Sequence, residues 1–62
     1  MTDAPTVEEL RAYLLETDGT DYEASDETLA QLLTRARAYS GSRLGILTAA
    51  RNFARRASRD PE

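Results

Sequence analysis

The chain has 62 residues, which is enough for one small domain and leaves no room for a second core. It contains no Cys and no His, so disulfide bonds, thiolate metal sites and the usual general base are excluded. No apolar run approaches the roughly 18 residues of a membrane span, and no signal peptide is expected at Met1. We therefore expect one cytoplasmic domain over residues 1–62 that is not an enzyme and holds no cofactor or metal ion.

Charge is divided unequally along the sequence. Residues 1–31 carry nine acids against Arg11 alone, a net charge of −8, whereas residues 32–62 carry seven arginines against Asp60 and Glu62, a net charge of +5. All eight basic residues are Arg, whose planar guanidinium makes bidentate contacts with carboxylates and phosphates. This asymmetry predicts two surfaces with different partners, or one surface that meets the other.

The first helix is predicted over residues 7–16. Thr6 and Glu9 form a capping box at its start, and Gly19 follows it as a left-handed stop. The apolar residues of this helix recur at helical spacing, and they are Val7, Leu10, Tyr13 and Leu14. Leu15 lies off this apolar face, so it is expected either to cover a loop or to contact a partner.

The acidic residues 17–25 predict a loop, and Ser25 is the expected N-cap of a second helix over residues 26–39. The apolar stripe of this helix consists of Leu29, Leu32, Leu33, Ala36 and Tyr39. Gly41 is the expected left-handed residue after the helix, and Ser42 the expected N-cap of the next one. The loop lacks the ligand spacing of an EF-hand, so we expect no metal site there.

A third helix is predicted over residues 43–58, and it completes an all-α domain of three helices without strands. One face of this helix is rich in alanine, which lets a neighbouring helix approach closely but buries little area. The expected core of the domain consists of Leu10, Leu14, Leu29, Leu32, Leu33, Ile46, Leu47 and Phe53.

Arginines follow one another at four-residue spacing on the other side of the third helix, at positions 51, 55 and 59. Like charges at this spacing repel each other on an isolated helix, which favours a negatively charged partner. The alternative is that these arginines pair with the acidic half of their own chain. The expected partner-binding residues are Arg51, Arg55, Arg56, Arg59, Arg43, Tyr22 and Leu15. Tyr22, in the acidic loop, is the aromatic residue expected to be available to a partner.

We expect this partner to be a protein, either a different one or a second copy of the chain. Nucleic acid is the less favoured alternative, because the chain is acidic overall and Tyr13, Tyr39 and Phe53 are expected on core faces rather than beside the arginines. A third hypothesis is an inhibitor whose acidic half mimics phosphates toward a DNA-binding enzyme.

The order of the three segments resembles a family of small helical proteins. The segments 6–14 (TVEELRAYL), 26–39 (DETLAQLLTRARAY) and 48–56 (TAARNFARR) are similar to the short head-completion form of the head–tail connectors of long-tailed bacteriophages. The resemblance implies a helical virion-assembly protein that acts by contact with other proteins. That family usually has some thirty or more additional residues between the last two helices and beyond.

A second, narrower resemblance involves residues 39–47 (YSGSRLGIL). They are similar to the N-terminal single-stranded-DNA-binding domain of plasmid antirestriction proteins, although Arg43 stands where that family has Asn. This resemblance covers only the second half of the chain and implies a role in binding DNA.

Overall fold

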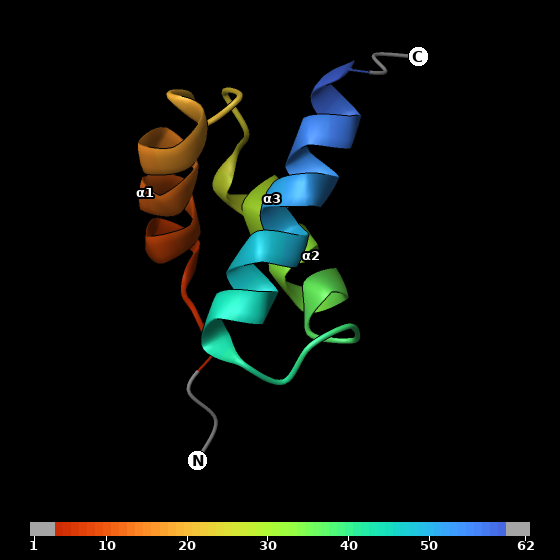
Figure 1. Ribbon diagram of the computed structural model, residues 1–62. Helices are drawn as coiled ribbons and strands as arrows, with labels where there is room; N and C mark the ends of the chain where they lie inside the picture. Colours follow the sequence, from red (N-terminus) through yellow and green to blue (C-terminus); the bar gives the residue numbers. More distant parts are fainter. Residues whose placement is uncertain (1–3, 60–62) are drawn as a thin grey trace.

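The computed structural model describes residues 4–59, except for the side chain of Arg59, and within that range it contains three helices and no strand. They are α1 (Val7–Asp18), α2 (Asp26–Ala36) and α3 (Arg43–Arg59). In Figure 1, α1 lies on one side of the molecule and α3 runs past both other helices. The expected all-α, three-helix domain is therefore confirmed.

All three helices begin where the sequence predicts, because each start is capped by a nearby side chain. The Thr6 hydroxyl accepts a hydrogen bond from the Glu9 amide at 3.2 Å, and the Glu9 carboxylate accepts one from the Thr6 amide at 2.9 Å. Ser25 caps α2 by accepting from the Thr28 amide at 3.2 Å. The Ser42 hydroxyl accepts from the amide nitrogen of residue 45 at 3.0 Å.

The ends of the helices differ from the prediction. α1 continues two residues further, to Asp18, before Gly19 stops it with φ 74° as expected. α2 ends at Ala36 rather than at Tyr39, because the chain tightens there into a turn in which the Tyr39 amide bonds to the Ala36 carbonyl at 2.9 Å. Gly41 was also wrongly predicted as a left-handed residue, since Gly19 is the one glycine with positive φ in the part of the chain described.

The turn between α2 and α3 depends on a different glycine. A β-carbon placed on Gly45 would lie 2.8 Å from Cβ of Ser40 and 2.7 Å from the capping hydroxyl of Ser42. The absence of a side chain at Gly45 therefore lets the turn fold back over the first turn of α3.

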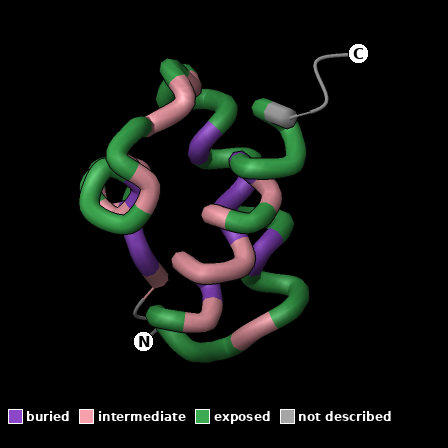
Figure 2. Tube along the Cα trace, turned by 45° about the horizontal axis from the view of Figure 1, so that its top comes forward, coloured by how far each residue is buried: buried purple, intermediate pink, exposed green. Residues whose placement is uncertain are grey.

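The core lies where the three helices face one another, and the buried segments gather there in Figure 2. It consists of Leu10, Leu14, Leu29, Leu32, Leu33, Ala36, Ile46, Ala50 and Ala54. The predicted core residues Leu47 and Phe53 are only partly buried against this cluster. Tyr39 was wrongly placed on the apolar stripe, since it is 72% exposed once α2 has ended at Ala36.

Candidate interaction surfaces

The arginines of α3 do not form a free stripe, because Arg55 is used within the fold. It makes a bidentate ion pair with Asp18 at the end of α1, through Nε at 2.9 Å and Nη2 at 2.7 Å. The Asp18 side chain is only 3% exposed and also accepts a hydrogen bond of 2.5 Å from the Tyr22 hydroxyl. The hydrogen bonds from Arg55 hold the pKa of Asp18 well below its ordinary value of 3.8, and the hydrogen bond from Tyr22 lowers it further.

Arg51 lies against α1 as well. Its guanidinium carbon is 5.4 Å from the centre of the Tyr13 ring, in the range of a cation–π contact. Arg51 also donates a hydrogen bond of 3.5 Å to the Tyr13 hydroxyl, which lies 3.2 Å from the Thr48 hydroxyl. Arg43, at the start of α3, forms an ion pair with Glu9 of α1. Pairing with the acidic half, the alternative left open for positions 51, 55 and 59, therefore holds for Arg55. Arg43, which is not part of that stripe, pairs with the acidic half as well.

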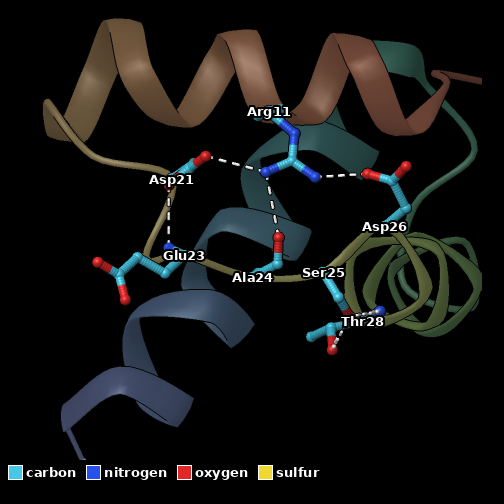
Figure 3. A network of polar contacts seen from close by, with 7 residues as sticks. All are labelled: Arg11, Asp21, Glu23, Ala24, Ser25, Asp26 and Thr28. Atoms are coloured by element: carbon cyan, nitrogen blue, oxygen red, sulfur yellow. Dashed lines mark hydrogen bonds and ion pairs between the residues drawn. The ribbon is translucent and has the colours of Figure 1, made fainter.

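Arg11 organises the acidic loop that precedes α2, as Figure 3 shows. Its guanidinium donates to Asp21 at 2.9 Å, to the Ala24 carbonyl at 3.1 Å and to Asp26 at 2.5 Å. These contacts tie α1 to the loop and to the first residue of α2. No group of three or more His, Cys, Asp or Glu residues that could hold a metal ion occurs in the described part of the chain.

Tyr22 belongs to this folded loop and is only partly exposed. Its ring packs against the core, and its hydroxyl is bonded to Asp18. The loop turns sharply at this point, since Tyr22 and Glu23 both have positive φ, of 58° and 55°. The aromatic residue that is most exposed is instead Tyr39.

Tyr39 forms a surface with residues of both α2 and α3. Its ring meets that of Phe53 edge to face, with the centroids 5.6 Å apart, and the Arg35 guanidinium carbon lies 5.6 Å from the centre of the Phe53 ring. Arg56 lines two adjoining open hollows beside these rings, with volumes of about 450 and 300 Å³. We call Arg35, Tyr39, Phe53 and Arg56 the basic-aromatic surface.

The arginines of this surface form no ion pair with an acidic residue in the described part of the chain, residues 4–59. Of the sites named from the sequence, Arg56 is exposed and forms no ion pair among residues 4–59, and the Arg59 side chain lies outside the described residues. Arg35, which is not among the residues predicted from the sequence, is likewise exposed and forms no ion pair in that range. The end of α2 is the signal that could have identified both residues. Because the helix ends at Ala36, Arg35 lies in its last turn and Tyr39 lies outside the helix.

Leu15 lies where the sequence predicts, on the outer side of α1, and it is 50% exposed. The residues that share this side are exposed too, and they are Glu8, Ala12 and Glu16. We call Glu8, Ala12, Leu15 and Glu16 the acidic α1 face.

No family model, curated protein or solved structure matches this chain. None of the helices in residues 4–59 combines the length and apolar content needed to cross a membrane. The surfaces of the molecule itself are therefore the basis for a functional proposal.

Proposed function

We propose that this protein is a non-enzymatic protein–protein adaptor whose basic-aromatic surface binds an acidic protein surface, either of a different protein or of a second copy of the chain. The observation that carries the proposal is the position of Arg35 and Arg56 beside the exposed Tyr39 and half-buried Phe53, without acidic partners among residues 4–59. Aromatic residues and arginine are the side chains most enriched at the energetic centres of protein interfaces. A fold that leaves them together on its surface favours such a contact.

The order of the helical segments supports a more specific form of the proposal. Because segments 6–14, 26–39 and 48–56 resemble the short phage head-completion connectors, we propose that the adaptor acts in virion assembly, in the host cytoplasm or in the virion. Portal and capsid genes beside the coding sequence would support this form. Plasmid-transfer or defence genes in that position would count against it.

Single-stranded nucleic acid is the second candidate ligand, and one observation favours it. Tyr39 and Phe53 lie beside arginines, contrary to the expectation from the sequence, and aromatic rings next to cationic groups are a stacking platform for bases. The opposing consideration is charge, because Arg11, Arg43 and Arg55 are already paired with carboxylates and the whole chain carries a net charge of −3.

Fluorescence anisotropy with a labelled oligonucleotide separates these candidates. At near-physiological salt we expect an affinity no tighter than roughly 10 μM, which allows generic electrostatic attraction but no dedicated site. The variant Arg35→Gln/Arg56→Gln serves as the test and Arg37→Gln as the matched control, because Arg37 is exposed but lines neither hollow. Submicromolar binding that falls steeply with salt and disappears only in the double variant would overturn the adaptor proposal.

A photo-crosslinker at Asn52, which lines the second hollow, tests the adaptor function directly in cells. We expect a discrete protein adduct that is lost with Arg35→Gln/Arg56→Gln and retained with Arg37→Gln. Adducts of equal yield in both variants, or none with the unmodified surface, would contradict binding at this surface.

A further inference from the structure

The basic-aromatic surface has a counterpart on α1. On that helix, residues 8, 12, 15 and 16 lie within about 100° of one another at the helical spacing of ~100° per residue. The acidic α1 face thus presents the apolar side chains of Ala12 and Leu15 between the carboxylates of Glu8 and Glu16. Neither glutamate forms an ion pair among the described residues. The face is therefore charged and apolar at once, and nothing in residues 4–59 covers it.

We propose that the acidic α1 face of one copy of this chain docks on the basic-aromatic surface of a second copy. This inference rests on the proposed function and names the partner of the same surface. Two arginines beside two aromatic rings on one surface match two carboxylates beside two apolar side chains on the other. Opposite charges and apolar groups are thus complementary between them.

The two surfaces belong to different parts of the molecule, so the contact is head-to-tail. α1 packs its inner side, with Leu10 and Leu14, into the core, and the acidic α1 face points away from it. The basic-aromatic surface is built from the end of α2, the following turn and α3, and it does not include α1. A head-to-tail contact leaves one surface free at each end, so a third copy can add to the pair.

The small area of the two surfaces indicates how strongly two copies associate. A standard stable interface buries about 800 Å² on each partner, which is a large share of the 4361 Å² of accessible surface of this small molecule. Two patches of a few side chains bury less than that. We expect a dissociation constant of about 10–1000 μM that rises with salt, because exposed charges contribute a large part of the attraction.

Two neutralised variants test the head-to-tail contact. Arg35→Gln/Arg56→Gln lacks the cations of the basic-aromatic surface, and Glu8→Gln/Glu16→Gln lacks the carboxylates of the acidic α1 face. In sedimentation equilibrium at low salt, we expect the wild-type mass to rise with concentration up to about 1 mM. Each variant alone should show at least a fivefold weaker association. An equimolar mixture of the two variants should form one-to-one pairs and no larger assemblies. The intact acidic α1 face of the first variant can bind only the intact basic-aromatic surface of the second, so each pair has a single interface.

Controls separate folding from association. Circular dichroism should show the same helix content in both variants, and Arg37→Gln should associate like the wild type. A monomeric wild type at about 1 mM, or a mixture that behaves like its unmixed components, would overturn the head-to-tail contact. Association of either variant with wild-type strength would overturn it as well.

The crosslinker at Asn52 distinguishes a failure of this inference from a failure of the proposed function. An adduct of twice the chain mass, lost with Glu8→Gln/Glu16→Gln, supports a second copy as the partner. A discrete adduct with a different protein and a monomeric chain overturns the second copy but leaves the adaptor function standing. Submicromolar binding of an oligonucleotide in place of any protein adduct overturns both.

Discussion

Asp18 is the residue at which the two oppositely charged halves of the chain are joined most closely. Its carboxylate is nearly inaccessible and is bound by Arg55 and Tyr22. Asp18→Asn should lower the free energy of unfolding by about 1–3 kcal/mol at neutral pH, because a charged acceptor that two donors recognise is lost. Urea denaturation followed by circular dichroism measures this difference. Glu16→Gln is the control, since this exposed carboxylate forms no ion pair in the described structure, and it should leave stability unchanged.

The pH dependence of that difference follows from the pKa of Asp18. Folding lowers the pKa below 3.8, so the ionised carboxylate stabilises the fold above the pKa of the unfolded chain. This contribution is lost as the pH falls through the lower, folded pKa. The difference between wild type and Asp18→Asn should therefore be constant above about pH 5 and shrink below pH 3.8. A difference that grows on acidification would contradict the assignment.

The sequence alone does not identify this contact. Charge counting shows that arginines of the second half can pair with acids of the first, but nine acids compete for that role. Asp18 is the acid that pairs with Arg55, because α1 continues two residues beyond its predicted end and places this carboxylate against α3. The contact of Tyr22 with Asp18 could not be predicted for the same reason, since its hydroxyl finds this partner only after the loop has closed on Asp18.

At the scale of the elements, the starts of helices are predictable and their ends are less so. A helix start depends on a capping side chain within three residues, as at Thr6, Ser25 and Ser42. The end of α2 depends instead on a tertiary contact, because the turn after Ala36 packs Tyr39 on Phe53 of α3. No local pattern in the sequence specifies that contact.

The burial of Phe53 leads to a prediction that separates core from surface. Leu29 is fully buried, so Leu29→Ala should cost about 2–5 kcal/mol, which is enough to unfold a chain of this size. Phe53 is only partly buried, so Phe53→Ala should cost less than about 2 kcal/mol and leave the domain folded. Thermal melts of the two variants measure this order. A reversed order would show that Phe53 belongs to the core and not to the basic-aromatic surface.

At the scale of the whole molecule, the three-helix fold can be predicted from the sequence, whereas the basic-aromatic surface cannot. Three amphipathic segments with short connections are sufficient to predict a helical bundle. The basic-aromatic surface requires in addition the rotation of α2 relative to α3, which brings Arg35 over Phe53. Ala36, Ala50 and Ala54 are buried in the core, and small residues there let the helices pack closely.

The pairing of the two halves also predicts how salt affects the folded molecule. Arg43–Glu9 and Arg55–Asp18 join the basic half to the acidic half, so screening them should destabilise the fold. We expect the melting temperature to fall by a few degrees between about 50 and 500 mM NaCl, measured at about 10 μM protein to avoid association. The variant Arg43→Gln/Arg55→Gln lacks both pairs, and its melting temperature should change by less than half as much. A rise with salt in both proteins would instead mean that repulsion within the net charge of −3 outweighs the attraction between the halves.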